Sequence, residues 1–191
     1  MARPREFDEE RALDQAMRLF WTQGYQGTSL HDLLQTMGIS KSSFYETFGS
    51  KRDLFMRSLE HFDETQSLNA VANLDADVPV KTILAEMFAM IIDRAVNQKR
   101  GCMFGKSAVE LSHRDPVVRK RAAAGIRSVE DTLHKVVVRG KKSGELSKHC
   151  EARLLARSLT ATFYGLQVMG NANVPQKVLK DVVSAALKEL D

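Results

Sequence analysis

The sequence predicts an all-α protein of about nine helices, and three features of the chain lead to this fold class. Apolar residues recur at three- and four-residue spacing over long stretches, as they do on one face of a helix. Glycine and proline separate these stretches. No stretch alternates apolar and polar residues as a half-buried strand does. We therefore expect an N-terminal unit of short helices joined to a larger helical body.

The first two helices are expected to be short and to end at glycines. Apolar spacing places the first at about residues 8–23, with Gly24 as its stop. The second begins at Ser29, whose three-residue spacing to Asp32 fits a capping box, and it ends at Gly38. Glycine suits both ends because it adopts a positive φ without steric cost.

Two further helices follow without a long connection. Ser40 is the expected N-cap of the third helix, which ends just before Ser50. Ser50 opens the fourth helix, again with an acid three residues on, at Asp53. The pattern predicts an N-terminal domain of residues 1–52 and a C-terminal domain of residues 53–191.

The C-terminal domain is expected to hold five more helices. Residues 69–79 are acidic and poor in large apolar residues, so they are expected to loosen or end the fourth helix. Asp115 and Pro116 fit an N-cap followed by a first helical position, and Gly144 fits a stop. The five helices are expected at residues 80–97, 103–111, 115–143, 151–169 and 175–190.

Composition excludes several classes of protein. No apolar run approaches the roughly 20 residues that cross a bilayer, and residues 1–10 lack the apolar core of a signal peptide. Two cysteines, Cys102 and Cys150, are too few for a secreted disulfide scaffold. We expect a soluble, cytoplasmic protein that has no membrane partner.

The net charge of +4 is distributed unevenly along the chain. Residues 1–57 balance eight basic against eight acidic side chains, whereas residues 97–142 hold twelve against four. The basic segment 97–142 has three interpretations: a solvated helix face, an entry that attracts an anionic ligand, or an auxiliary DNA contact. Charge alone therefore does not locate a nucleic-acid site, so the site has to be located from a sequence motif.

Residues 28–51 carry that motif. Two short helices joined by a turn that contains glycine form a helix-turn-helix pattern, in which Gly38 supplies the turn. Ser40 caps the following helix and leaves its N–H groups free to face phosphate. The outward side chains of this helix are short and polar, which suits the major groove. The candidate DNA-binding residues are Thr28, Ser29, Ser40, Lys41, Ser42, Ser43, Tyr45, Thr47 and Lys51.

These residues are expected to divide into two roles. Those at the start of the third helix, among them Ser42 and Ser43, reach base edges. Tyr45 and Lys51 are better placed for backbone phosphates, and the N–H groups at Thr28 and the residue after it can hold a phosphate as well. The alternative is that the glycine turn is only a structural corner between two helices.

The stretch of residues 38–54 resembles the signature of the tetracycline-repressor (TetR) family of transcription regulators. It reads Gly, apolar, Ser, and then Tyr45, Phe48, Lys51 and Leu54 at three-residue intervals. The resemblance covers about residues 10–56, and the rest of the chain agrees in length and in helix number. It implies a bacterial-type regulator, most often a repressor, that binds palindromic operator DNA as a homodimer. The resemblance also implies that the two copies pair through their last two helices.

Two departures from the family pattern concern the motif itself. Ser42 stands where glycine is commonest, and Leu34 stands where a small alanine is frequent. They suggest a slightly different crossing of the two helices and an operator preference of the chain's own.

The last two predicted helices have apolar faces that permit pairing with a second copy. The alternative is that these faces only complete the core of one chain. The residues involved are Leu154, Leu155, Leu159, Phe163 and Leu166 with small Ala156, Ala161 and Gly165, and then Val178, Leu179, Val182, Val183, Ala186, Leu187 and Leu190.

Adaptable apolar side chains in the body suggest a small-molecule site, although core packing is the alternative for each of them. Cys102 is the most distinctive candidate, since it precedes a predicted helix and has Lys99, Arg100 and Lys106 nearby. Each of these features favours a thiolate. The candidate sensing residues are Cys102, Met87, Phe88, Met103, Phe163 and Tyr164, with Met90, Phe104 and Met169 as further lining.

The Gly101-Cys102 segment resembles that of TetR-type regulators that sense electrophiles, of the N-ethylmaleimide-reductase-repressor type. In that type the reactive cysteine pairs with a lysine late in the chain, whereas here the matching region lies near Gly170 and Lys177 is a few residues away. The alternative is a buried, inert cysteine that packs as a small hydrophobe.

The leading hypothesis is a repressor released by a small ligand or by modification of Cys102. An activator or a constitutive DNA binder is the near alternative. From other classes, we consider a thiol enzyme with Cys102 as nucleophile, and a ligand-binding protein that has lost DNA binding. None of the five histidines lies in a catalytic pattern, and no metal-ligand or phosphate-loop spacing occurs, so no catalytic residue, metal or cofactor is expected.

Overall fold

The computed structural model describes residues 7–66, 68, 78–147, 149–188 and 190 of the chain. Within these residues it holds nine α-helices and no strand, as the sequence predicts. The helices are α1 (Glu9–Gly27), α2 (Leu30–Met37), α3 (Lys41–Phe48), α4 (Lys51–Gln66), α6 (Val80–Val96), α7 (Met103–Leu111), α8 (Pro116–Ser143), α9 (Ala152–Asn171) and α10 (Gln176–Lys188).

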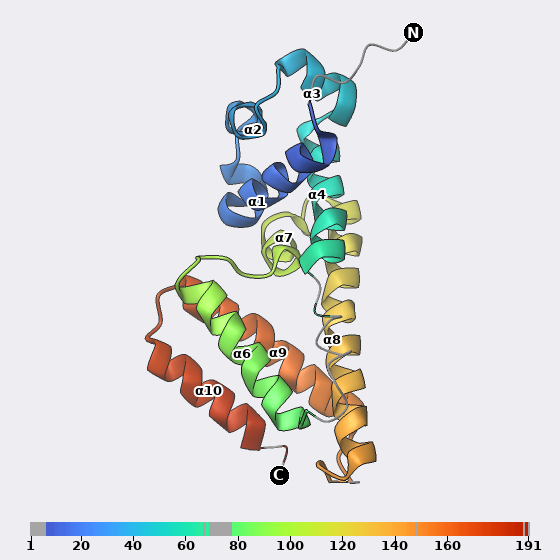
Figure 1. Ribbon diagram of the computed structural model, residues 1–191, viewed down its shortest axis with the longest axis vertical. Coiled ribbons are helices and arrows are strands. Elements are labelled where there is room, and N and C mark those ends of the chain that lie inside the picture. The colour runs from blue at the N-terminus through green and yellow to red at the C-terminus, as the bar shows by residue number, and fades with distance from the viewer. Residues whose placement is uncertain (1–6, 67, 69–77, 148, 189, 191) are drawn as a thin grey trace.

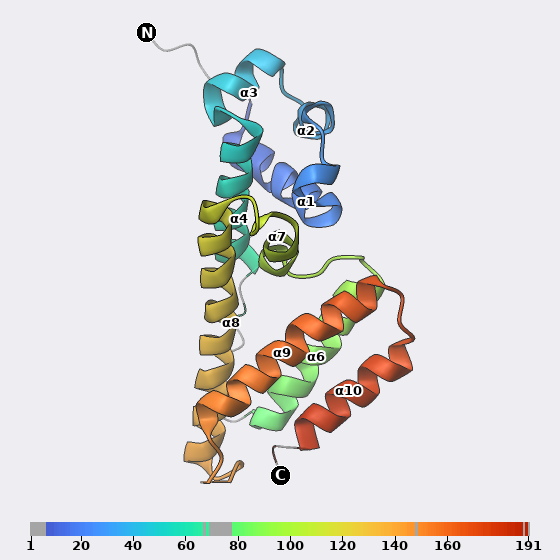
Figure 2. The ribbon, with the colours of Figure 1, turned by 180° about the vertical axis from the view of Figure 1, so that it is seen from behind.

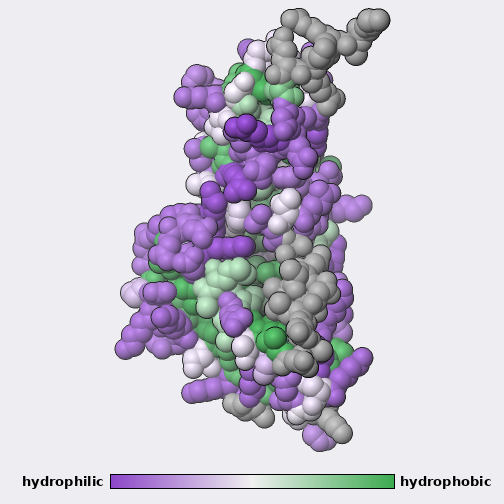
Figure 3. All heavy atoms as spheres, in the orientation of Figure 1, coloured by the Kyte–Doolittle hydropathy of each residue, from purple (hydrophilic) through white to green (hydrophobic). Residues whose placement is uncertain are grey.

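The helices form a small head and a larger body, with α7 between them (Figure 1). The head consists of α1, α2 and α3, and α4 leads from it towards the body. In the body, α6, α9 and α10 pack together at the end away from the head, and α8 runs along one side (Figures 1 and 2). The head is mostly hydrophilic on the face shown in Figure 3, whereas hydrophobic side chains gather lower down, in the body.

The break that the sequence predicts at Gly24 is present, but a further helical turn follows it. Gly24 has φ 80° and ψ 173°, which are not helical values, and α1 continues beyond it to Gly27. Glycine is required there because other residues rarely adopt this φ. The interruption redirects the chain, so that the last turn of α1 lies against α7, in the body.

Local capping fixes most of the other helix ends where the sequence places them. Ser29 and Asp32 form the reciprocal capping box, and Ser40 accepts a hydrogen bond from the N–H of Ser43. In α8, Asp115 caps the first turn ahead of Pro116. The predicted starts and ends of the last two helices are off by one or two residues, since α9 spans Ala152–Asn171 and α10 spans Gln176–Lys188. Most of the expected loose segment 69–79 lies outside the described residues.

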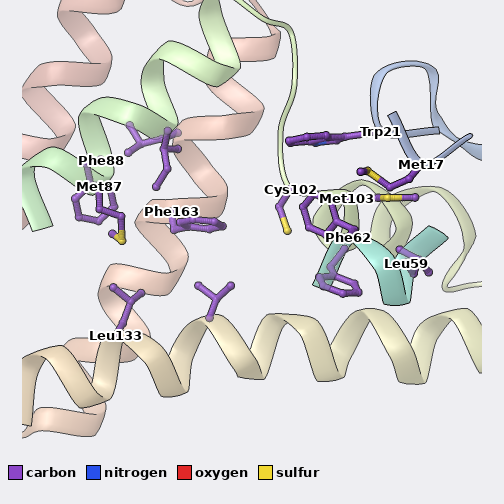
Figure 4. Packing of buried hydrophobic residues seen from close by; sticks show 14 of the residues in the cluster. Met17, Trp21, Leu59, Phe62, Met87, Phe88, Cys102, Met103, Leu133 and Phe163 are labelled. Atoms are coloured by element: carbon purple, nitrogen blue, oxygen red, sulfur yellow. The ribbon is translucent and has the colours of Figure 1, made fainter. Parts of the chain in front are cut away.

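The core runs from the head into the body as one cluster of buried side chains. In the head, Phe20 of α1 meets Phe55 of α4 edge to face, with ring centroids 5.1 Å apart. At the head–body joint, Trp21 meets Phe62 in the same way at 5.0 Å. Further down, Phe163 of α9 packs with Met87 and Phe88 of α6, as Figure 4 shows. No helix in the described part of the chain is long and apolar enough to cross a bilayer.

Candidate DNA-reading head and sensing groove

The turn between α2 and α3 has the geometry that the sequence predicts. Gly38 adopts φ 65° and ψ 31°, the left-handed conformation, and its N–H donates to the carbonyl of Leu34. Phe44 and Phe48 of α3 are buried beneath the turn, together with Leu33 of α2. The buried side of the short α3 is therefore packed firmly within the head, and the other side of this helix faces solvent.

Three serine hydroxyls gather at the start of α3. The Oγ of Ser40 accepts from the N–H of Ser43 at 3.1 Å, and it lies 2.9 Å from the Oγ of Ser42 and 2.8 Å from the Oγ of Ser43. Of these serines Ser40 and Ser42 are exposed, and so is the neighbouring Lys41. A cluster of small hydroxyls at a helix N-terminus offers both hydrogen-bond donors and acceptors to an anionic partner.

The other candidate DNA-binding residues are held in different ways. Tyr45 is 48% exposed, whereas Thr47 is half-buried. The Thr28 hydroxyl is buried and donates to the carbonyl of Gly24 at 2.7 Å, so this side chain supports the head from inside. The Lys51 ammonium lies 4.4 Å from the centroid of the Tyr25 ring, and burial lowers its pKa.

A groove of about 570 Å³ lies at the joint between head and body. Its walls come from the end of α1 and from α7, α8 and α9, and they are mostly apolar. Val109 and Val168 stand on its rim and are 81% and 66% exposed. Cys102 and Tyr164 line it together, with the thiol sulfur 3.7 Å from the Tyr164 hydroxyl.

Cys102 also borders a second, smaller cavity of about 50 Å³. Trp21, Gly101, Cys102 and Gln167 line both spaces, so they form the wall between them. The Cys102 N–H donates to the side-chain oxygen of Gln167, which fixes this wall to α9. Figure 4 shows the Cys102 side chain among the buried residues, between Phe163 on one side and Met103 on the other.

Of the two interpretations of Cys102, the environment of the side chain favours the buried thiol over the thiolate. Burial raises the pKa of its thiol, and hydrogen bonds from the backbone and from Tyr164 oppose this only in part. The three nearby cations are engaged elsewhere: Lys99 with the Asn173 side chain, Arg100 over the Trp21 ring, and Lys106 with carbonyls of α1. The thiol is therefore protonated at neutral pH.

The structure brings together only some of the candidate sensing residues. Phe163 lines the small cavity and Tyr164 lines the groove, each beside Cys102. Met87, Phe88 and Met103 are buried in the core and line neither space. Among the further lining residues, Phe104 borders the small cavity, and so does Met90, which is partly exposed.

Sequence reasoning missed the role of Lys106 and Glu110 at the head–body joint. Glu110 of α7 accepts hydrogen bonds from the N–H groups of Tyr25 and Gln26, which lie 85 and 84 residues earlier in the chain. No local pattern pairs residues so far apart. The one available signal is the glycine at position 24, which marks a helix break that some other group has to satisfy.

The described residues hold no group of three or more His, Cys, Asp or Glu side chains that could bind a metal ion.

Two protein-family models match separate parts of the chain. Residues 12–57 match the model of the bacterial regulatory proteins of the tetR family, and residues 80–185 match the tetracyclin repressor-like C-terminal domain. The chain belongs to the TetR family. It is therefore a regulatory protein with a DNA-binding head, which sets aside the alternative of a thiol enzyme.

Individual relatives match over nine tenths or more of their length. The chain is 30% identical to an uncharacterized HTH-type transcriptional regulator, YezE of Bacillus subtilis, over 100% of both chains. It is 27% identical to the HTH-type transcriptional repressor ComR of Escherichia coli, over 97% of this chain and 90% of that protein.

Two solved structures of similar proteins match nearly the whole chain. The regulator CifR, a cysteine mutant in complex with 26-base-pair operator DNA, is 28% identical and superposes with a TM-score of 0.86 over 100% of both chains. Reduced E. coli NemR is 21% identical with a TM-score of 0.82, over 95% of this chain and 96% of that one, which shows a shared fold alone.

Proposed function

We propose that this TetR-family regulator is a repressor that binds a palindromic operator as a homodimer and is released through the groove beside Cys102. The observation that carries the proposal is the rigid, outward-facing α3 with its hydroxyl cluster, in a chain that matches the operator-bound CifR structure over its whole length. The names of ComR and of BdcR, another E. coli repressor that is 32% identical over 72% of this chain, favour repression over activation or constitutive binding.

In this proposal the head reads DNA from the N-terminus of α3. Lys41, Ser42 and Ser43 are exposed or half-exposed there and reach base edges or phosphates in the major groove. Tyr45 contacts the sugar-phosphate backbone, and the N–H groups around Ser29 hold a further phosphate. Thr28, Thr47 and Lys51 act more by shaping the head, since each is buried or half-buried. Ser40 is exposed and acts by capping α3.

We propose that the two copies pair through α9 and α10, which lie on the face turned to the viewer in Figure 2. Leu155, Leu159, Phe163 and Leu166 of α9 are buried within one chain. A different stripe of the same helix is available for the partner, with large side chains at its two ends and small ones between. It comprises Leu154, Ser158, Ala161, Gly165 and Val168, of which Leu154 and Val168 are 65% and 66% exposed.

The inducer proposed for the groove is a small, largely apolar molecule that carries a hydrogen-bonding group. The apolar walls and the few polar groups, among them Tyr164 and Gln167, support this class. Because the Cys102 thiol is protonated, reversible binding is favoured over rapid oxidation as the releasing event, and covalent modification of Cys102 is the second route.

The basic segment 97–142 fits a solvated helix face best. Arg119, Lys120, Arg127 and Lys135 are exposed on α8, away from the DNA-reading side of the head. Arg100 lines the small cavity, which keeps an anionic ligand as the second interpretation. We further propose the division of the chain into a DNA-binding domain, residues 1–52, and a sensing and dimerisation domain, residues 53–191, and a cytoplasmic location beside the operator.

The test is binding of the purified protein to DNA from its own upstream region, followed by footprinting. We expect a discrete footprint on a palindrome, and we expect it to weaken when iodoacetamide alkylates Cys102 in a Cys150→Ser background. The Cys102→Ser variant is the matched control and should keep the footprint under the same treatment. Absence of any sequence-selective binding would refute the operator proposal, while binding that ignores alkylation would restrict release to reversible ligands.

A further inference from the structure

The break in α1 leaves two kinds of backbone group without their helical partners. In an unbroken α-helix, the carbonyls of residues 21 and 22 accept hydrogen bonds from the N–H groups of residues 25 and 26. Gly24, with φ 80° and ψ 173°, departs from helical geometry between them. The two carbonyls then form the negative end of one helical segment, and the two N–H groups form the positive start of the next turn.

Two charged residues of α7 bind these groups, the cation at the carbonyls and the carboxylate at the N–H groups. The Lys106 ammonium donates to the carbonyls of Trp21 and Thr22 at 3.1 and 2.7 Å. One helical turn later, the Glu110 carboxylate accepts from the N–H groups of Tyr25 and Gln26 at 3.0 and 2.6 Å. We call Lys106 and Glu110 the α7 latch. Because they are four residues apart on one helix, they face the break together.

The fit around the break is close. A Cβ atom placed on Gly24 would lie 2.9 Å from a carboxylate oxygen of Glu110, so the glycine also makes room for the latch. The Trp21 indole N–H donates to the carbonyl of Gly101, which joins α1 to the segment just before α7. The latch and this bond hold the head against the body through charged and backbone groups, whose geometry is specific.

The α7 latch lies on the wall of the groove. Gly24, Lys106 and Glu110 line one part of it, while Cys102 and Tyr164 line another. Cys102 is also the residue directly before the first turn of α7. A molecule in the groove therefore contacts Lys106 and Glu110, which hold the head, and it also contacts α7, the helix that carries these two residues.

We propose that Lys106 and Glu110 are positioning residues that set the angle of the DNA-reading head by replacing the hydrogen bonds lost at Gly24, and that an occupant of the groove acts by shifting them. The second part rests on the proposed function, because it takes the groove as the inducer site; the first part does not. A head that is no longer held samples several angles, and only the fraction with the competent angle binds operator.

Operator affinity and the fluorescence of Trp21 together test the latch. Trp21 is the only tryptophan of the chain and lies within the contact, 4% exposed. We expect Lys106→Met and Glu110→Gln each to lower operator affinity about tenfold or more, and to shift Trp21 emission to the red. The matched controls are Lys120→Met and Glu86→Gln, exposed charges on α8 and α6, which should change neither quantity.

Exchanging the two charges separates the latch from an ordinary ion pair. In Lys106→Glu with Glu110→Lys, a carboxylate would face carbonyls and an ammonium would face N–H groups. We expect this double variant to bind operator no better than either single variant, whereas a simple i, i+4 ion pair would be restored by the exchange. Restored affinity, or single variants within about twofold of the parent, would overturn the proposal.

The proposal and the repressor function fail in distinguishable ways. If the parent protein binds no operator, the repressor function fails, and the latch is still judged by Trp21 emission: unchanged emission in both single variants overturns it. If the parent binds and is released by alkylation of Cys102, the latch variants should reduce that release to about twofold or less. Alkylation forms a sulfur–carbon bond while iodide leaves and the thiol proton passes to buffer. Undiminished release in the variants would overturn the coupling.

Discussion

Lys41 and Ser42 are neighbours on the first turn of α3, yet they offer DNA different kinds of contact. A lysine ammonium neutralises a phosphate and releases a counterion, whatever the local base sequence. A serine hydroxyl is short and donates or accepts depending on the base it meets, so its contribution changes with sequence. The structure leaves both side chains exposed, with Ser42 held by the Ser40 hydroxyl at 2.9 Å.

Lys41→Met should therefore weaken binding to every sequence and reduce the slope of log affinity against log salt by about 0.9. Ser42→Ala should leave the slope unchanged and alter the ranking of operator variants. Both are measured by titrating a small operator library at several salt concentrations, with Lys120→Met as control. A Ser42→Ala variant that weakens all sequences equally would contradict this division of roles.

The reactivity of Cys102 should reflect its burial. Because the thiolate is the nucleophile and burial raises the pKa of this thiol, the folded protein holds less thiolate at any given pH than the unfolded chain does. In a Cys150→Ser background, we expect alkylation by iodoacetamide at about pH 8 to be slower in the folded protein than in urea. The folded rate should still rise with pH above 9.0, the ordinary pKa of the thiol. A plateau below that pH would show an activated thiol instead.

Helix α8 depends on one residue at its start. The Asp115 carboxylate accepts from the N–H groups of Val117 and Val118, and it pairs with Arg52 of α4 at 2.7 Å. The hydrogen bond from Arg52 is the largest cause that lowers the pKa of Asp115 to about 2, and the backbone bonds add to it. The lowered pKa stabilises the fold above the ordinary pKa of 3.8, and this stabilisation is lost as the pH falls towards 2.

Asp115→Ala should accordingly destabilise the protein by about 1 kcal/mol at neutral pH, the usual cost of losing an N-cap. The difference between parent and variant should shrink as the pH falls from about 5 towards 2, because the protonated carboxyl gives up both partners. Urea unfolding at a series of pH values measures this. A difference that is constant over that range would assign the effect to packing and not to charge.

Gly125 lies in the middle of α8, where glycine is ordinarily unfavourable. A Cβ atom there would come within 2.2 Å of the Phe104 ring of α7, which is buried. We expect Gly125→Ala to cost about 1–3 kcal/mol through overpacking, although the same change in an open helix stabilises. The midpoint of urea unfolding gives the value. A stabilised variant would mean that α7 moves away easily from α8.

Elements that depend on neighbouring residues could be predicted from the sequence, and contacts across the chain could not. Three helix starts could be predicted because the capping side chain bonds to a backbone N–H only two or three residues further on, at Ser29, Ser40 and Asp115. The continuation of α1 to Gly27 escaped prediction because Glu110, far along the chain, satisfies the broken turn. The sequence left two interpretations of Cys102 open for a similar reason: tertiary packing decides whether the thiol is buried and which groups the nearby cations bind.

At the scale of the whole molecule, the proposed homodimer explains how one short recognition helix can suffice, because a single such helix gives little affinity and a palindrome matches a two-fold axis. Gly165 of α9 offers a direct test of where that axis lies. A Cβ atom on Gly165 meets nothing within 4 Å in its own chain, and the residue stands between exposed Ala161 and Val168. An added Cβ therefore has room within one protomer, whereas in the proposed dimer a larger side chain there would collide with the second protomer.

Gly165→Leu should therefore keep the helical content and the melting behaviour of the protomer while raising the dimer dissociation constant about 100-fold, as sedimentation velocity over a concentration series would measure. Operator affinity should fall with it, since two heads no longer bind as a unit. The matched control is Ala89→Leu, a comparable enlargement at an exposed position of α6. If Gly165→Leu stays dimeric, the pair forms through another face, and the exposed stripe of α9 belongs to a different contact.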